Sequence, residues 1–480
     1  MAGPGMLKFV TVSQAPPEKR AAETRRHDFD EIYQRFATDK VAVQAARCSQ
    51  CGVPFCQVHC PLHNNIPDWL MLTAAGRLEE AAEIASATNA MPEICGRICP
   101  QDRLCEGNCV IERAGHGTVT IGAIEKYILD TAWEKGWIPP LHPGAATGKS
   151  VGIIGAGPAG LAAAEQLRIK GHDVHIYDRY DRMGGLLVYG IPNFKLEKDV
   201  VARRTERLAA GGVVYHPRTN VGTTVSFAHL RQRHDAILIA TGVYKPRDIE
   251  APGVGLKGII PALEYLIASN RKGFGDPVAA FDEGPLNAAG KKVVVIGGGD
   301  TAMDCVRTAV RQGAASVTCL YRRNRENMPG SQREVSYAIE EGIIFSFLAS
   351  PRAFTGDTEV HSIIADRVHL GVPDATGRQH PQIVDGGHFT LEADLVIKAL
   401  GFDPEDLPTL FEEPQLPVTR WGTIATDPFT KATTLPGVFA AGDIVRGAAL
   451  VVWAIRDGRD AAEAIHTYLA AAPSVAAAAE

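Results

Sequence analysis

The chain has 480 residues, more than one ordinary domain holds, so we expect two or three domains. Its composition is globular, with 45% hydrophobic and 22% charged residues. The formal net charge is -6 and no block of Lys or Arg stands out, which excludes an electrostatic basis for binding nucleic acid or an acidic membrane. The first residues lack the apolar segment of a signal peptide, and no apolar run approaches the roughly 20 residues of a membrane span. We expect a soluble, cytoplasmic protein.

Residues 1–147 show mainly helical patterns. Apolar residues recur at helical spacing in "LEEAAEIASATN" and "IGAIEKYILDTAWEKG", between turn signals. This part also holds eight of the ten cysteines, between Cys48 and Cys109. Disulfides are poor candidates in a reducing cytoplasm. Cys305 and Cys319 stand in apolar patterns, and we interpret them as small core residues.

The spacing of the eight cysteines favours iron–sulfur clusters over zinc. Ferredoxins use a tight cysteine run that closes in Cys-Pro, and both runs here, "CSQCGVPFCQVHCP" and "CGRICPQDRLCEGNC", contain a Cys-Pro pair. Structural zinc usually shows paired CxxC knuckles, and this chain has one CxxC. Zinc remains the alternative, but by count the cysteines match two [4Fe-4S] clusters; they are Cys48, Cys51, Cys56, Cys60, Cys95, Cys99, Cys105 and Cys109.

From Val151 onward, short β-branched runs alternate with helical stretches, which is typical of parallel sheets covered by helices. The runs are "SVGIIG", "DVHIYD", "DAILIAT", "KVVVIGGG", "SVTCLYR", "ADLVIKALG" and "GVFAAGD". A Pro/Gly-containing linker, "LHPGAATGKS", separates them from the helical part. We expect the final "LAAAPSVAAAAE" to be a frayed helix end or a disordered tail.

A glycine loop of the dinucleotide-binding type follows the first of these strands. Gly155, Gly157 and Gly160 have GxGxxG spacing between a strand and an apolar-faced helix. The first glycine allows a tight turn, the second allows a pyrophosphate to approach the backbone, and the third allows close helix packing. Asp178 ends the next strand, about twenty residues later, where its carboxylate can accept hydrogen bonds from ribose hydroxyls.

The pattern recurs at "KKVVVIGGGDTAMDCVRTAV", with Gly297, Gly299 and the small residue Ala302. In the strand that follows, Tyr321 takes the place of the ribose carboxylate, and two arginines follow it. Guanidinium groups can bind a 2′-phosphate, so this second site is predicted to prefer NADP over NAD.

Two further turns follow predicted strands, one at the end of "DAILIATG" and one in "FAAGD". Together with the glycine loops they resemble the flavin disulfide-reductase-like family, in which an inserted NAD(P)H domain interrupts an FAD domain. The resemblance covers residues 148 to about 470. It implies an FAD domain at 148–273 and 388–480 and an NADPH domain at 274–387. No CxxC occurs after Cys51, so electrons must leave the flavin by another route.

The same resemblance implies which residues contact the two nucleotides. FAD would bind at Gly155, Gly157, Gly160, Asp178, Gly185, Thr241, Gly242, Gly442 and Asp443. NADPH would bind at Gly297, Gly299, Asp300, Ala302, Arg322 and Arg323.

The cysteine part followed by the two nucleotide domains resembles the small (β) subunits of NADPH-dependent glutamate synthases over essentially the whole chain. The same module is similar to the N-terminal part of dihydropyrimidine dehydrogenase and to the NADP-binding subunit of electron-bifurcating oxidoreductases. The resemblance implies one cluster on Cys48, Cys51, Cys56 and Cys109 and a second on Cys60, Cys99 and Cys105. Glu125, at the position of a glutamine ligand in one relative, or Cys95 would complete the second cluster.

The function that this resemblance implies is electron input. NADPH would reduce FAD by hydride transfer, and single electrons would pass through the clusters to a large (α) subunit carrying FMN, which makes L-glutamate from L-glutamine and 2-oxoglutarate. The partner makes the protein a hetero-oligomer, and no catalytic side chain is expected because the cofactors carry the chemistry. Two alternatives stay open: a ferredoxin-linked or electron-bifurcating partner, and a zinc-stabilised protein that senses NADPH.

Overall fold

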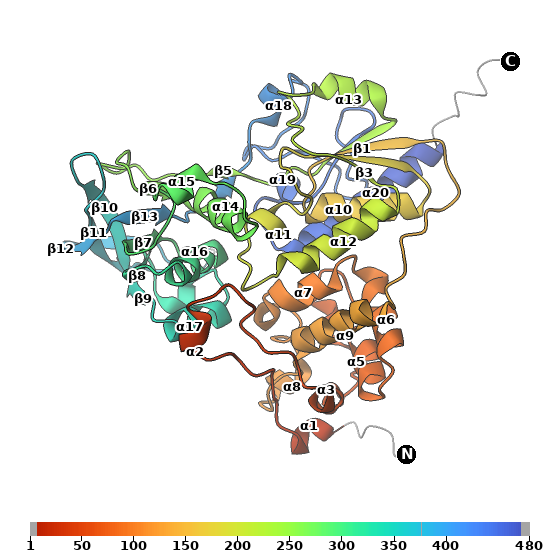
Figure 1. Ribbon diagram of the computed structural model, residues 1–480, viewed down its shortest axis with the longest axis horizontal. Coiled ribbons are helices and arrows are strands. Elements are labelled where there is room, and N and C mark those ends of the chain that lie inside the picture. Colours follow the sequence, from red (N-terminus) through yellow and green to blue (C-terminus); the bar gives the residue numbers. More distant parts are fainter. Residues whose placement is uncertain (1–6, 376, 472–480) are drawn as a thin grey trace.

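A computed structural model describes residues 7–375 and 377–471. In these residues the chain forms a helical unit, followed by two α/β units with parallel sheets (Figure 1). This confirms the predicted fold class. No helix in the described part of the chain is long and apolar enough to span a bilayer.

The helical unit packs around α9, its longest helix. Gly96 of α7 lies so close to α9 that a Cβ there would be 2.8 Å from the Lys126 amide nitrogen, so glycine is needed for this crossing. Gly136 ends α9 in the left-handed conformation, at φ 72°. The elements of this unit are α1 (Lys8–Thr11), α2 (Ala22–Arg25), α3 (Thr38–Ala45), α4 (Phe55–Val58), α5 (Ile66–Ala74), α6 (Leu78–Thr88), α7 (Pro92–Ile98), η1 (Gln101–Arg103), α8 (Val110–Arg113) and α9 (Ile121–Lys135).

The first α/β unit has a five-stranded parallel sheet in the order β15-β4-β1-β2-β3, counted over the described residues. Helices α10, α12 and α20 cover the face toward the helical unit, and α13 and α18 lie on the opposite face (Figure 1). Its elements are β1 (Ser150–Ile154), α10 (Pro158–Ile169), β2 (Asp173–Tyr177), α11 (Leu186–Tyr189), α12 (Lys198–Ala210), β3 (Val214–His216), α13 (Phe227–Arg233), β4 (Ala236–Ile239), α18 (Leu407–Leu410), β15 (Val438–Ala440), α19 (Asp443–Arg446) and α20 (Val451–Ala471).

The second α/β unit has a parallel sheet in the order β6-β13-β7-β8-β9 and an antiparallel sheet in the order β10-β11-β12. Its elements are β6 (Ile259–Pro261), α14 (Ala262–Gly273), α15 (Ala279–Asp282), β7 (Lys292–Ile296), α16 (Asp300–Arg311), β8 (Ser316–Tyr321), η2 (Arg325–Asn327), α17 (Gln332–Glu340), β9 (Ile344–Phe347), β10 (Ala349–Thr355), β11 (Ser362–Leu370), β12 (Pro381–Glu392) and β13 (Leu395–Lys398).

The seven runs predicted as strands from residue 150 onward all form strands of the two parallel sheets. By sheet membership the second unit spans 259–398, wider than the expected 274–387, because β6 and β13 both pair into its sheet. A short ribbon of β5 (Lys245–Pro246) and β14 (Phe402–Asp403) carries the chain between the units. The segment expected to be a frayed end or a tail begins within α20, and its residues 472–480 lie outside the described residues.

Buried ion pairs join the helical unit to the first α/β unit. Arg204 of α12 donates from Nε and Nη2 to the two carboxylate oxygens of Glu93 on α7, at 2.9 and 2.8 Å. The Glu93 side chain is fully buried. Breaking a buried pair of this kind costs about 3–5 kcal/mol, because it leaves a charge without a partner. The two units therefore dock in a defined orientation.

The segment before α3 ties the helical unit to the second α/β unit. Arg25 is buried and donates from Nε to Glu341, 3.0 Å away, and Lys19 pairs with Glu340 at 2.6 Å. Farther along, Arg35 pairs with Glu134 on α9 at 2.7 Å.

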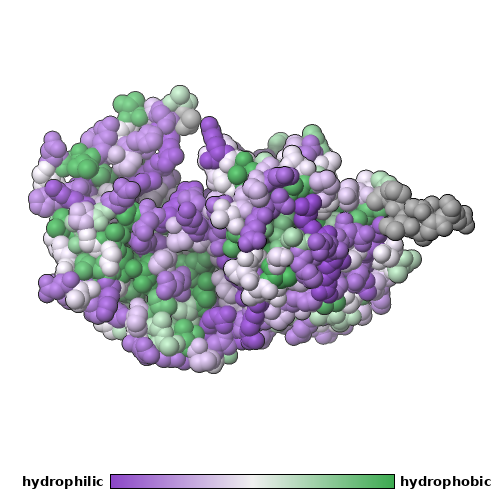
Figure 2. All heavy atoms as spheres, turned by 90° about the horizontal axis from the view of Figure 1, so that it is seen from above, coloured by the Kyte–Doolittle hydropathy of each residue, from purple (hydrophilic) through white to green (hydrophobic). Residues whose placement is uncertain are grey.

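On the face shown in Figure 2, a notch separates the lobes formed by the two α/β units.

A buried imidazole in the first α/β unit gives the fold a pH dependence. His234 lies between Ser150 Oγ, 2.6 Å from Nδ1, and the Tyr177 hydroxyl, 2.9 Å from Nε2. Burial, with smaller contributions from neighbouring His175 and Arg233, lowers the pKa of His234 from 6.5 to about 4. Between these values the unfolded chain binds the proton more readily, so this contribution to stability is complete above pH 6.5 and is lost as the pH falls toward 4.

We therefore expect His234→Gln to flatten the fall in the free energy of unfolding between pH 6.5 and 4, measured by urea unfolding at a series of pH values. His229→Gln, at an exposed position of α13, is the matched control and should keep the wild-type slope. An unchanged slope in His234→Gln would show that this imidazole does not contribute.

Candidate functional site: two dinucleotide loops and two cysteine sets

The first glycine loop connects β1 to α10, and its geometry requires glycine at two positions. Gly155 has φ +110°, and a Cβ there would lie 2.3 Å from the Ala240 carbonyl oxygen. A Cβ at Gly160 would lie 2.0 Å from the Gly155 carbonyl oxygen, so α10 packs directly on the turn. A Cβ at Gly157 would meet no described atom within 4 Å. The loop therefore fits a pyrophosphate, which needs open backbone at the start of a helix.

Other predicted FAD residues surround this loop. Asp178 is buried and accepts hydrogen bonds from the amides of Ala156, at 2.6 Å, and Tyr180, at 2.8 Å. A Cβ at Gly185 would lie 2.7 Å from Gly157 Cα, which brings the turn before α11 against the loop. The structure thus brings together segments that the sequence separates.

The remaining predicted FAD residues lie at the same end of the sheet. Thr241 lines a small pocket with Gly155 and Asp178, and Gly242 follows it. Gly442, at φ +80°, precedes α19, and a Cβ there would lie 2.9 Å from the Ala159 Cβ. Burial raises the pKa of Asp443 to about 7. These positions fit a nucleotide that crosses the carboxyl ends of the strands.

The second glycine loop repeats the geometry of the first. Gly297 has φ +147°, and a Cβ there would lie 2.3 Å from the Ala399 carbonyl oxygen. A Cβ at Gly299 would meet no described atom within 4 Å, and Ala302 is fully buried in α16. Asp300 begins α16 and accepts a hydrogen bond from the Ser331 amide, 2.9 Å away. This loop also fits a dinucleotide.

The residues after β8 differ from those after β2 in a way that suits a phosphate. Tyr321 fills the carboxylate position, with its ring against Gly298 and its hydroxyl donating to the Asn327 carbonyl, 2.8 Å away. Arg323 has two buried guanidinium nitrogens, Nε and Nη2, without a hydrogen-bond partner in the described part of the chain. Arg322 is exposed. Buried donors without partners are costly, and a bound 2′-phosphate would satisfy them.

Four thiols, here called the first cysteine set, line one small cavity in the helical unit: Cys48, Cys51, Cys56 and Cys109. Burial raises the pKa of Cys48 to about 11 and of Cys56 to about 12, and neighbouring thiols add to the effect in Cys56. Without a bound cation Cys48 and Cys56 therefore stay protonated. A cationic iron–sulfur cluster would bind them as thiolates, which fits the set.

The second cysteine set consists of Cys60, Cys95, Cys99 and Cys105, and the pKa values of Cys60, Cys99 and Cys105 are each raised in part by another thiol of the set. Burial raises the pKa of Cys60 to about 11, and it raises that of Cys105 well above its ordinary value. Cys99 lies within hydrogen-bonding reach of Cys95, and this contact, together with burial, raises the pKa of Cys99 well above its ordinary value.

Glu125 of α9 also faces the second cysteine set. Its side chain is buried, and in the described residues its carboxylate has no hydrogen-bond or ion-pair partner. Burial raises the pKa of Glu125 well above its ordinary value, and Cys95 adds to the shift. Both candidates for the remaining ligand are thus in place. In the described part of the chain, no three His, Cys, Asp or Glu side chains converge closely enough to hold a single metal ion.

The second cysteine set lies between the first set and the first α/β unit. Cys95 belongs to the hydrophobic core that contains α10 and α20, and Cys60 and Cys99 pack against that core. Cys60 also contacts the core of the helical unit, where the first set is found. Arg456 of α20 donates to the Pro61 carbonyl, 3.0 Å away.

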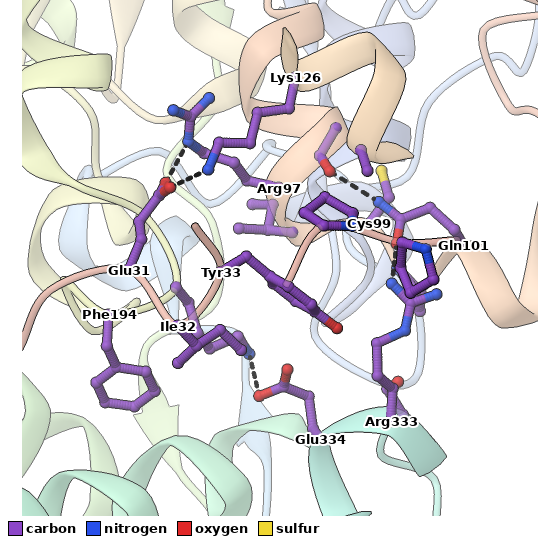
Figure 3. A pocket seen from close by; sticks show the side chains of 18 of the residues that line it. Glu31, Ile32, Tyr33, Arg97, Cys99, Gln101, Lys126, Phe194, Arg333 and Glu334 are labelled. Carbon is purple, nitrogen blue, oxygen red and sulfur yellow. Dashed lines mark hydrogen bonds and ion pairs between the residues drawn. The ribbon is translucent and has the colours of Figure 1, made fainter. Parts of the chain in front are cut away.

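A central cavity of about 780 Å³ lies where the three units meet (Figure 3). It is lined by Cys99 from the second set, by Asp300 from the second glycine loop and by Val451 at the start of α20. Charged side chains also line it. Glu31 pairs with Arg97 at 2.5 Å and with Lys126 (Figure 3).

Sequence reasoning missed the charged lining residues Glu31, Arg97 and Lys126. They come from segments far apart in the chain, and none belongs to a recognisable motif. Lys195 is another example: it is half-buried, lines the cavity and pairs with Asp304 on α16 at 2.8 Å. A lysine after a Pro-containing turn carries no sequence signal of such a position.

Comparison with known proteins agrees with this architecture. Residues 25–137 match the family described as "Dihydroprymidine dehydrogenase domain II, 4Fe-4S cluster", and residues 149–458 match the family "Pyridine nucleotide-disulphide oxidoreductase". The structure of Mycobacterium tuberculosis FprA in complex with NADPH is similar, with a TM-score of 0.56 and 21% identity, over 67% of this chain and 85% of that one. At that identity the likeness concerns the fold alone.

Two curated relatives align over nearly their full length. The glutamate synthase (NADPH) small chain of Azospirillum brasilense is 67% identical over 98% of this chain and 97% of its own length. The protein of the same name from Escherichia coli K12 is 45% identical over 97% of this chain and 99% of its own length. The chain therefore belongs to the pyridine nucleotide-disulphide oxidoreductase family and, within it, to the glutamate synthase (NADPH) small chains.

Proposed function

We propose that this chain is the electron-input subunit of a glutamate synthase. It oxidises NADPH and passes electrons to a large (α) subunit carrying FMN, which makes L-glutamate from L-glutamine and 2-oxoglutarate. The central cavity carries the proposal, because Asp300 of the second glycine loop and Cys99 of the second cysteine set line the same space. The names of the two relatives described above, both small chains, support a large partner.

The proposal assigns each cofactor to residues of this chain. The first glycine loop, with Asp178, Gly185 and Asp443, holds FAD, and the second loop, with Arg323, holds NADPH. A bound flavin accepts a hydride from a nicotinamide and releases electrons singly, which iron–sulfur clusters require. The residues of the chain supply orientation and charge, and no side chain serves as a general acid or base.

Two [4Fe-4S] clusters on the two cysteine sets follow from the same proposal. The first cluster binds Cys48, Cys51, Cys56 and Cys109. The second binds Cys60, Cys99 and Cys105, with Glu125 or Cys95 as the remaining ligand. Because the second set packs against the core of the first α/β unit, its cluster is the one nearer FAD. The ten free thiols are consistent with a reducing cytoplasm as the place of the reaction.

Cofactor analysis tests this proposal directly. Protein purified without oxygen should be coloured and should contain one FAD and about eight iron and eight sulfide per chain, as two [4Fe-4S] clusters require. Addition of the large subunit should make NADPH oxidation depend on glutamine and 2-oxoglutarate. A colourless, iron-free protein would overturn the proposal, and zinc in its place would favour an NADPH sensor. Coupling to ferredoxin in place of the large subunit would favour the ferredoxin-linked alternative.

The assignment of Arg323 predicts a change in nucleotide preference. Arg323→Gln removes a charged donor to the 2′-phosphate, worth about 1.5–3 kcal/mol, so kcat/KM for NADPH should fall about 10-fold to 150-fold. kcat/KM for NADH, which lacks that phosphate, should change little. Arg322→Gln, at the exposed neighbouring position, should lower kcat/KM for NADPH by a smaller factor. An equal fall in kcat/KM for NADPH and NADH would show that Arg323 does not bind the 2′-phosphate.

A further inference from the structure

One arginine of the second α/β unit reaches across to the loop that carries the second cysteine set. Arg333, on α17, donates from Nη1 to Gln101 Oε1 at 3.0 Å and from Nη2 to Glu106 Oε2 at 2.9 Å. Figure 3 shows its guanidinium pointing toward Gln101 at the edge of the central cavity. Gln101 follows Cys99 by two residues, and Glu106 directly follows Cys105.

Both acceptors are themselves held in place. Gln101 is buried and donates from Nε2 to the carbonyls of Cys95, at 3.2 Å, and Gly96, at 3.1 Å. Glu106 is also buried, and its other oxygen accepts from the Gly122 amide on α9 at 3.0 Å. The guanidinium therefore joins two anchored groups, one on each side of the second cysteine set's loop.

The segment just before Arg333 is joined to the second glycine loop. The Gly330 amide donates to the Gly298 carbonyl at 3.1 Å, and the Ser331 amide donates to Asp300 at 2.9 Å. From the other side, Arg103 donates to the Pro329 carbonyl at 2.7 Å. A displacement of Arg333 would therefore displace the loop that the NADPH pyrophosphate is proposed to bind.

We propose that Arg333 is a positioning residue that fixes the NADPH-binding loop against the loop bearing Cys99 and Cys105, and so sets the width of the central cavity that Asp300 and Cys99 both line. This inference rests on the proposed function. The fork of the guanidinium is essential, because two acceptors on different segments must be bound at once. A lysine offers a point charge that cannot reproduce this geometry.

The test compares Arg333→Gln and Arg333→Lys with wild-type holoenzyme. We expect Arg333→Gln to lower the limiting rate of flavin reduction by NADPH about 10-fold to 100-fold, the size of effect expected from a misplacement of about 1 Å. The Kd of NADPH should change less than about threefold, because Arg333 does not contact the glycines of the loop. Arg333→Lys should recover only a small part of the rate, since a lysine retains the charge beside Glu106 but cannot bind Gln101 at the same time.

Arg325→Gln is the matched control. Its guanidinium binds Gln332 at 3.4 Å and Ser336 at 3.1 Å, both close to it in the same segment, and does not reach the cysteine loop. The control should keep the wild-type rate of flavin reduction. If Arg333→Gln caused a general loss of fold in the second α/β unit, its melting temperature and its content of bound nucleotide would fall below those of the Arg325→Gln control.

Amide hydrogen exchange gives a second readout that does not depend on activity. Arg333→Gln should speed exchange in residues 101–107 and 329–333, and Arg325→Gln should leave residues 101–107 unchanged. Wild-type flavin reduction together with unchanged exchange in Arg333→Gln would overturn the inference. If NADPH fails to reduce wild-type flavin, the proposed function fails, and the exchange result alone still decides whether Arg333 fixes the two loops.

Discussion

Electron transfer between separate cofactors requires that they lie close together, and one short loop contacts both of the α/β units that are proposed to hold FAD and NADPH. The loop from Cys99 to Cys105 carries two thiols of the second cysteine set and borders the central cavity. Cys99 and Leu104 of this loop pack against the core of the first α/β unit. Gln101 of the loop and Glu106, which follows it, bind Arg333 of the second α/β unit. The three units must keep their relative orientation for this loop to contact the other two units at the same time.

Charges buried between the units provide that orientation. Arg204 and Glu93 join α12 to α7, and Arg25 joins the N-terminal segment to Glu341, the residue that follows α17. Such pairs add little net stability, because desolvation offsets their attraction, but a misaligned arrangement would leave each charge unpaired. They therefore select one docking of the units, and hydrophobic contacts such as those of Cys95 and Ile94 supply most of the driving force.

Local features could be predicted from the sequence, and long-range ones could not. Gly155 and Gly297 were identified because their turns need a conformation that other residues rarely adopt. The strands were found from β-branched runs. The limits of the second unit were missed at β6 and β13, because their pairing joins segments on either side of a whole antiparallel sheet. Arg333 and Lys195 gave no signal, since their partners are set by the docking of units.

The order of the two cysteine sets is the central structural claim, and EPR spectroscopy of reduced clusters tests it most directly. In a protein with the first set disabled by Cys48→Ala and Cys51→Ala, NADPH should still reduce the remaining cluster. With the second set disabled by Cys60→Ala and Cys99→Ala, the first cluster should assemble but stay oxidised after NADPH is added. Rapid reduction of the first cluster in the absence of the second would contradict the account.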